Sequence, residues 1–130
     1  MVRIILSGCN GKMGKVISSI VSNFPDLSIV AGVDKSNQQN TYPVFSNIAD
    51  CTVDADVIVD FSRPDALDSL LKYAKEKNVG IILCTTGFSD EQILKIKEAS
   101  KEIPVFRSAN MSIGINVVNK VLKSISALLY

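Results

Sequence analysis

Three glycines spaced three residues apart stand where an apolar segment gives way to a segment with helical periodicity. They are Gly8, Gly11 and Gly14, in the stretch "ILSGCNGKMG" of residues 5–14. In such a turn the first glycine permits tight backbone angles, the middle one lets amide groups approach a pyrophosphate, and the last allows close helix packing. The spacing therefore indicates phosphate-binding chemistry, although a tight turn without a ligand would use the same pattern.

Polar residues inside and just after the turn bear on the same chemistry. Asn10 stands where a G-x-G-x-x-G pattern has its second glycine, and asparagine is the residue that best tolerates the left-handed backbone region after glycine. Lys12 and Lys15 flank the start of the expected helix, where the helix dipole attracts anions. Ordinary solvated helix charge is the alternative interpretation of both lysines.

An acidic residue, Asp34, ends the second apolar run and follows Gly14 by 20 residues. In dinucleotide-binding folds an acid at this distance hydrogen-bonds a ribose 2′-hydroxyl. The turn and the acid together predict a dinucleotide site. A methyltransferase with a nucleotide cofactor would also explain Asp34, but neither Lys35 nor the lysines of the turn.

Short apolar runs predict the strands that position these residues, at 2–6, 27–33, 57–61, 79–84 and 104–106, with a short extended piece at Val44. Apolar residues with helical spacing follow the glycines, the Pro64–Asp65 pair and the Ser89/Gln92 capping box. A further helical pattern covers 115–129. Alternating strands and helices are typical of an α/β fold. We expect a Rossmann-like doubly wound parallel sheet in a single domain.

Hydroxyl and amide side chains follow three of the predicted strands, in "DFSRP", "CTTGF" and "RSANMS". Because ligands of open α/β sheets bind beyond the carboxyl ends of the strands, these loops and the glycine turn should converge on one crevice. Helix capping by Ser62, Ser89 and Ser112 is an alternative explanation for part of this composition.

Composition excludes several classes of function. The 130 residues are 47% hydrophobic and 21% charged with a net charge of +1, so no overall field favours nucleic acid, and no apolar run approaches the ~20 residues of a membrane span. We expect a cytoplasmic protein in which Cys9, Cys51 and Cys84 are reduced thiols. Histidine is absent, which removes the commonest acid–base group and metal ligand, so no metal site is predicted.

The stretches "GCNGKMG", "VDFSRPDA", "CTTGF" and "SANMSIGINV", in this order and spacing, resemble the N-terminal domain of the 4-hydroxy-tetrahydrodipicolinate (dihydrodipicolinate) reductase family of lysine and diaminopimelate biosynthesis. The similarity runs from about residue 2 to 125 and implies NADPH and NADH as cofactors. The contacts that it implies are Gly8, Cys9, Asn10, Gly11, Lys12 and Met13 at the pyrophosphate, Asp34 and Lys35 at the adenosine ribose, Cys84, Thr85 and Thr86 near the nicotinamide ribose, Ser108, Ala109, Asn110 and Met111 at the nicotinamide, and Phe61 lining the same crevice.

The sequence departs from the family pattern in two respects. Cys84 stands where the family usually has glycine, which adds bulk beside the ribose. The family's substrate domain, with paired histidines and a lysine, is expected beyond Tyr130, where the chain ends in apolar residues as if at a cut. We therefore expect a dinucleotide-binding domain at 1–109, and at 110–130 a hinge and the start of a helix leading to a missing substrate domain.

The resemblance implies the NAD(P)H-binding domain of a reductase that reduces a cyclic unsaturated dicarboxylate. With no catalytic residue expected in these 130 residues, this chain should bind cofactor without turnover. A non-catalytic NAD(H)-sensing domain is the alternative. The apolar stripe of Val118, Leu122 and Ile125 on the last expected helix favours a homo-oligomer.

Overall fold

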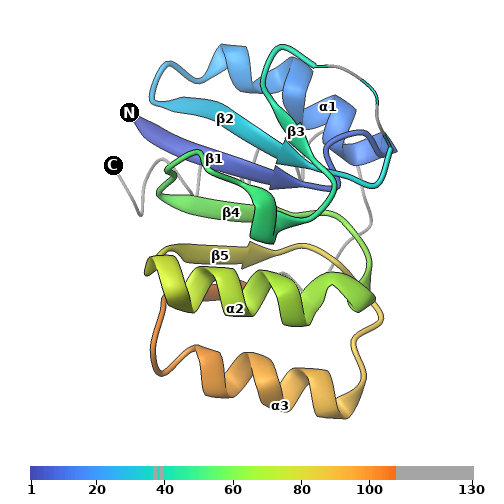
Figure 1. The fold of residues 1–130 in the computed structure, drawn as a ribbon, viewed down its shortest axis with the longest axis vertical. Helices are drawn as coiled ribbons and strands as arrows, with labels where there is room; N and C mark the ends of the chain where they lie inside the picture. Colours follow the sequence, from blue (N-terminus) through green and yellow to red (C-terminus); the bar gives the residue numbers. More distant parts are fainter. Residues whose placement is uncertain (37, 39, 108–130) are drawn as a thin grey trace.

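The computed structural model describes residues 1–36, 38 and 40–107 of the chain. Its strands form one six-stranded sheet in the order β3-β2-β1-β4-β5-β6, and all neighbouring strands are parallel (Figure 1). The strands are β1 (Val2–Ser7), β2 (Leu27–Val33), β3 (Val44–Phe45), β4 (Val57–Asp60), β5 (Gly80–Leu83) and β6 (Val105–Arg107). The helices are α1 (Lys12–Ile20), α2 (Leu67–Lys77) and α3 (Asp90–Ala99), with 3-10 turns η1 (Val21–Asn23), η2 (Ile48–Asp50) and η3 (Pro64–Ala66).

Successive side chains along the central strands pack into two separate apolar cores, one on each face of the sheet. Ile4 and Leu6 of β1 belong to the core that includes Ile17 of α1. Ile5, between them, belongs to the core that includes Leu70 of α2. The sheet therefore has helices on both faces, as a doubly wound fold requires, which confirms the α/β prediction (Figure 1).

The capping box predicted at the start of α3 is present. The Ser89 backbone N–H donates to Gln92 Oε1 at 2.9 Å, and the Gln92 N–H donates to Ser89 Oγ at 3.2 Å. The Gln92 amide also donates to the Pro64 carbonyl at 2.8 Å. This last bond ties the start of α3 to η3, which precedes α2.

Most differences from the expected elements are shifts of one residue at strand ends. One element, η2, was not predicted; Asn47 caps it by accepting a hydrogen bond from the Ala49 N–H at 3.0 Å. The helix expected over 115–129, and with it the apolar stripe proposed for self-association, lies outside the described residues.

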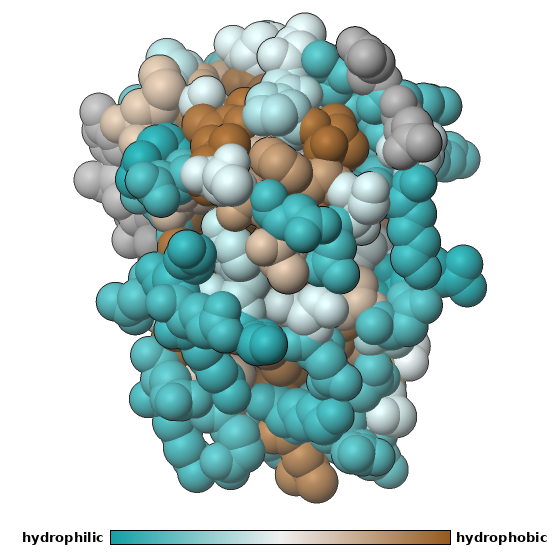
Figure 2. Space-filling view, in the orientation of Figure 1, coloured by the Kyte–Doolittle hydropathy of each residue, from teal (hydrophilic) through white to brown (hydrophobic). Residues whose placement is uncertain are grey.

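The face of the molecule that carries α2 and α3 is mostly hydrophilic in Figure 2, where teal atoms cover the region over these two helices. Exposed Leu94 is an apolar exception on α3, at 62% exposure. Across residues 1–36, 38 and 40–107, no helix has the length and apolar character needed to cross a membrane.

The C-terminus of α2 yields a stability prediction. Asn78 caps this helix in the left-handed region, with φ 55° and ψ 50°, a conformation that costs most side chains about 1–2 kcal/mol and glycine almost nothing. Asn78→Ala should lower the free energy of unfolding by about 1 kcal/mol, whereas Asn78→Gly should leave it equal or higher. Urea denaturation of the three proteins measures this, and equal losses in both variants would contradict it.

Candidate functional site

The glycine turn joins β1 to α1 and depends on two glycines for backbone clearance. Gly8 has φ +81°, and a Cβ there would lie 2.8 Å from the Phe61 carbonyl oxygen. A Cβ on Gly14 would lie 2.2 Å from the Gly8 carbonyl oxygen and 2.6 Å from that of Cys9. The predicted roles of the first and last glycine, a tight turn and close helix packing, are therefore confirmed.

Gly11 has no comparable packing role. Its φ of −75° suits any residue, and a Cβ would meet only the Gly8 carbonyl oxygen, at 3.3 Å. Gly11 is the N-cap of α1 and lines a cleft. A side chain at this position would thus occupy the mouth of the turn, which is the place expected for a phosphate group.

The amide donors of the turn are fewer than the sequence predicted. The Gly8 and Cys9 N–H groups donate to the Val33 carbonyl, at 2.7 and 3.4 Å. The Gly11 N–H donates to the Gly8 carbonyl at 3.1 Å. The amides at the start of α1, in residues 12–14, have no acceptor within the helix, as in the first turn of any helix. Of residues 8–13, which the family resemblance implies at the pyrophosphate, the amides of 8–11 are thus already paired within the protein, and those of 12 and 13 are not.

Asn10 does not take the left-handed conformation expected of it. Of the described residues other than glycine, Asn78 is the one with positive φ. The Asn10 N–H instead donates to Asp34 Oδ2 at 2.9 Å. Its side-chain amide donates to the carbonyls of Ser36 at 3.2 Å and Gln38 at 3.3 Å, so Asn10 joins the glycine turn to the loop after β2.

Asp34 follows β2 directly and stands beside the turn, as predicted. Besides the Asn10 N–H on Oδ2, it accepts the Ser36 N–H on Oδ1 at 2.9 Å. Each carboxylate oxygen has lone-pair capacity for one further donor. The structure thus holds the acid in place by two backbone donors while leaving acceptor capacity for a ligand.

A cleft of about 360 Å³ opens at the carboxyl ends of β1, β2 and β4. It brings together Gly8, Gly11, Asp34, Lys35 and Phe61 of the predicted residues. The others that line it are Ser7, Val33, Ser46, Ser62, Arg63, Asp65 and Ala66. Ser62, Arg63 and Asp65 come from the "DFSRP" loop and its continuation, which the sequence placed at this edge without assigning those side chains to the ligand.

Two oppositely charged side chains lie at the mouth of the cleft. Lys35 Nζ is 4.0 Å from Asp65 Oδ2, and both side chains are largely exposed, at 87% and 65%. An exposed pair at this distance contributes little free energy. Lys35 is therefore available to an anionic ligand at low cost.

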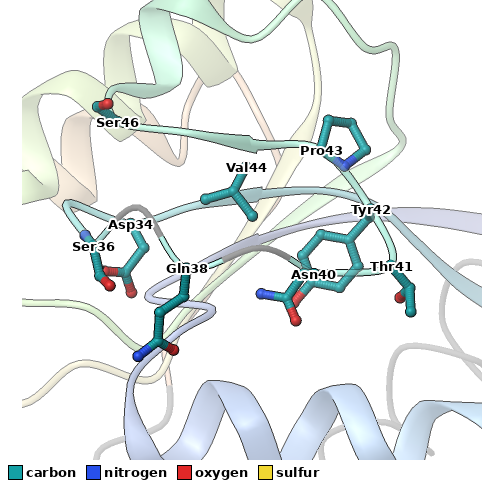
Figure 3. A pocket seen from close by; sticks show the side chains of 9 residues that line it. All are labelled: Asp34, Ser36, Gln38, Asn40, Thr41, Tyr42, Pro43, Val44 and Ser46. Atoms are coloured by element: carbon teal, nitrogen blue, oxygen red, sulfur yellow. The ribbon is translucent and has the colours of Figure 1, made fainter.

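A second hollow, of about 490 Å³, shares Asp34 and Ser46 with the cleft. Figure 3 shows the side chains that line this second hollow. Polar side chains of the loop that precedes β3 dominate it. Its lining consists of Asp34, Ser36, Gln38, Asn40, Thr41, Tyr42, Pro43, Val44 and Ser46. Asp34 is thus reached from both hollows.

Three predicted contact residues are buried instead of lining the cleft. Cys9 and Cys84 are 1% and 3% exposed in the apolar core under α1. Burial, with a smaller effect of the nearby Asp60 carboxylate, raises the pKa of the Cys84 thiol to about 12, and burial likewise raises that of Cys9 to about 11. Both stay protonated thiols, and Thr85, 7% exposed, turns its hydroxyl to Asp60.

The extra bulk expected from Cys84 therefore packs into the core. Thr86 is exposed just beyond it, Lys12 is exposed at the start of α1, and Met13 packs partly against the core. Ser108, Ala109, Asn110 and Met111 lie outside the described residues. All three cysteines are free, as predicted, and within the described part of the chain no group of histidine, cysteine and acidic side chains could hold a metal ion.

The fold and the glycine turn define a Rossmann-like α/β domain. The family described as "Dihydrodipicolinate reductase, N-terminus" matches residues 2–111. The chain belongs to this family.

Curated proteins similar to this chain carry the name of the same reductase. The chain is 63% identical to the 4-hydroxy-tetrahydrodipicolinate reductase of Clostridium novyi (strain NT), over all of the chain and 52% of that protein. It is 56% identical to the reductase of the same name from Clostridium tetani (strain Massachusetts / E88), over all of the chain and 51% of that protein. The chain thus spans about half the length of the curated relatives it matches.

Solved structures share the fold. The dipicolinate-bound dihydrodipicolinate reductase of Paenisporosarcina sp. TG-14 has a TM-score of 0.74 at 24% identity, over 98% of this chain and 54% of that one. A WlbA dehydrogenase of Chromobacterium violaceum, in complex with NADH and UDP-GlcNAcA, has a TM-score of 0.66 at 12% identity, over 82% of this chain and 34% of that one. At these identities the likeness concerns the fold alone.

The different surroundings of Gly14 and Gly11 predict different losses of stability when each is replaced by alanine. In a helix, Gly→Ala ordinarily stabilises by up to about 1 kcal/mol, but at Gly14 the new Cβ would lie 2.2 Å from a backbone oxygen. Gly14→Ala should therefore lower the free energy of unfolding by about 2 kcal/mol or more, and Gly11→Ala by less than about 1 kcal/mol. The midpoints of urea denaturation measure both, and similar midpoints for the two variants would contradict the packing account.

Proposed function

We propose that the chain binds NADPH or NADH in the 360 Å³ cleft and supplies the cofactor-binding half of a 4-hydroxy-tetrahydrodipicolinate reductase in lysine and diaminopimelate biosynthesis. The observation that carries the proposal is the Asp34 carboxylate, held 2.9 Å from the Asn10 N–H of the glycine turn. This contact supports a ribose acceptor beside a pyrophosphate site. The relatives' shared name supports the choice of reaction.

The residues of the cleft fit a dinucleotide. Gly11 keeps the space beside the turn open, and the amides of residues 12–14, which have no acceptor within α1, are available to a pyrophosphate. Asp34 accepts from ribose hydroxyls, and Lys35 attracts a 2′-phosphate where one is present. Bound there, the nicotinamide cofactor supplies the hydride, and the protein contributes binding and orientation.

The three predicted contact residues with buried side chains have a different role in this proposal. Cys9, Cys84 and Thr85 have buried side chains, so their part is to position the backbone at the ends of β1 and β5. Residues 1–109 form the cofactor-binding domain. In a protein of the relatives' length, residues 110–130 lead onward to the part that holds the dicarboxylate substrate.

Cofactor preference is expected to depend on two opposed charges. Asp34 favours NADH and repels a 2′-phosphate, whereas exposed Lys35 favours NADPH weakly. Asp34→Ser, which keeps an acceptor for the Asn10 N–H, should shift the ratio of the two Kd values about tenfold toward NADPH. Asp34→Ala should shift it the same way, and Lys35→Ala about threefold toward NADH.

Calorimetry with each cofactor suits this measurement because the chain has no tryptophan. Lys77→Ala, in the last turn of α2, removes a lysine outside the cleft and serves as the matched control. If the Asp34 and Lys35 variants leave the ratio within twofold of the wild type, the assignment of the adenosine end is wrong.

The 130 residues should bind cofactor without oxidising it. Reduction of the substrate needs a proton donor and cations that hold two carboxylates near the nicotinamide. The chain has no histidine, and arginine does not release a proton in proteins. Mixed with NADPH and the cyclic dicarboxylate, the chain should leave the absorbance of the reduced nicotinamide constant. Addition of the longer reductase of Clostridium novyi is the positive control, and oxidation by the chain alone at ~1–10³ per second would overturn the prediction.

A further inference from the structure

Asp60, the last residue of β4, has a fully buried side chain at 0% exposure. Its Oδ1 accepts the Ser62 N–H at 2.9 Å and the Ser62 hydroxyl, and its Oδ2 accepts the Thr85 hydroxyl at 2.9 Å. The Ser7 hydroxyl also favours its ionised form. None of the ion pairs among the described residues includes Asp60. Neutral donors alone therefore hold this carboxyl group.

Stability by itself gives no reason for an acid at this position. Burial raises the pKa of Asp60, and the hydrogen bonds from Ser62, Thr85 and Ser7 oppose that rise. A buried carboxylate without a cation is costly, and apolar residues of similar volume often replace buried polar groups without loss. The value of the acid lies in its geometry, because two oxygens with several lone pairs gather donors from several directions.

The residues that donate to Asp60 lie at or just beyond the ends of three adjacent strands. Ser7 ends β1, Ser62 follows β4, and Thr85 follows β5. These strands lie next to one another in the order β1-β4-β5, and Ser7 is paired with Asp60 in the sheet. Asp60 thus links the carboxyl ends of three strands at the edge where the cleft opens.

Two of the three linked residues, Ser7 and Ser62, belong to one wall of the cleft, whereas Thr85 is buried outside its lining. Ser7, Phe61 and Ser62 line it, and Asp60 lies behind them. The Phe61 carbonyl oxygen also faces Gly8 so closely that a Cβ there would approach to 2.8 Å. A shift of the chain after Asp60 would therefore displace both this wall and the glycine turn.

We propose that Asp60 is a positioning residue that, through Ser7, Ser62 and Thr85, holds the loops after β1, β4 and β5 in the arrangement that receives the dinucleotide. The proposal rests on the proposed cofactor binding and deepens it. Asp60 acts without touching the cofactor, since its side chain is fully buried.

The first test compares two Asp→Asn variants of the 130-residue chain. Asp60→Asn keeps the shape of the side chain but replaces one acceptor oxygen by a donor. Asp56→Asn is the matched control: Asp56 precedes β4 at its opposite end and accepts the Arg3 N–H at 2.8 Å and the Arg3 guanidinium at 3.1 Å. Both variants should unfold at lower temperature. Only Asp60→Asn should weaken NADPH and NADH binding, by about tenfold, with Kd measured by calorimetry well below both melting temperatures.

A second pair of variants approaches the same contact from its donor. Thr85→Val removes the hydroxyl that Asp60 Oδ2 accepts while keeping the branched shape, and it should weaken cofactor binding several-fold. Thr85→Ser restores the hydroxyl and should recover most of the lost affinity. If Thr85 acted only by packing, Thr85→Ser would bind the cofactor more weakly than Thr85→Val, because serine loses the methyl group that valine retains. These two variants test the positioning role even if Asp60→Asn does not fold.

The outcomes separate this proposal from the one on which it rests. A wild-type chain that binds neither NADPH nor NADH would overturn the cofactor proposal itself. A wild-type chain that binds, combined with equal Kd values for Asp60→Asn and Asp56→Asn, would overturn only the positioning role. Thr85→Ser binding as weakly as Thr85→Val would do the same.

Discussion

The close approach of backbone to backbone at the glycine turn is the constraint on which the rest of the structure depends. Gly8 passes the Phe61 carbonyl, and α1 begins so near the turn that a Cβ on Gly14 would lie 2.2 Å from the Gly8 carbonyl oxygen. This contact sets the position of α1 against β1 and β4. The turn itself, through Gly8 and Gly11, lines the cleft at the carboxyl edge of the sheet.

Polar groups are buried in this domain mainly where they shape that edge. Among the residues that the structure describes, the buried polar or charged ones are Ser7, Asp60 and Thr85, all at the carboxyl ends of neighbouring strands. Every buried side-chain nitrogen or oxygen in that part of the chain has a hydrogen-bond partner. The interior residues of β4 and β5 are apolar on both faces, as parallel strands covered by helices require: Ile58 and Ile81 belong to one core, Val59 and Ile82 to the other. The apolar cores therefore lie on the two faces of the sheet, and the buried hydrogen bonds of Ser7, Asp60 and Thr85 lie at its carboxyl edge.

Fold and family carry different information here. A likeness at 12% identity to a dehydrogenase in complex with NADH shows how widely this architecture occurs, so architecture alone does not identify a reaction. The family is shown instead by the match of residues 2–111 to the family described as "Dihydrodipicolinate reductase, N-terminus". In the proposed function, preference between NADPH and NADH depends on Asp34 and Lys35, two residues of opposite charge that line the cleft.

Local patterns in the sequence determined the strands, the helices with their capping box, the two glycine clearances and the position of Asp34, because each depends on neighbours along the chain and on the periodicity of burial. They did not reveal that Asn10 binds the loop after β2, that the first amides of the turn are already paired, or that Thr85 donates to Asp60. Asn10 and Asp34 are 24 residues apart, and Asp60 and Thr85 are 25 apart. Only the order of strands in the sheet brings such residues together, so only the tertiary structure decided which polar groups hold the site and which remain for a ligand.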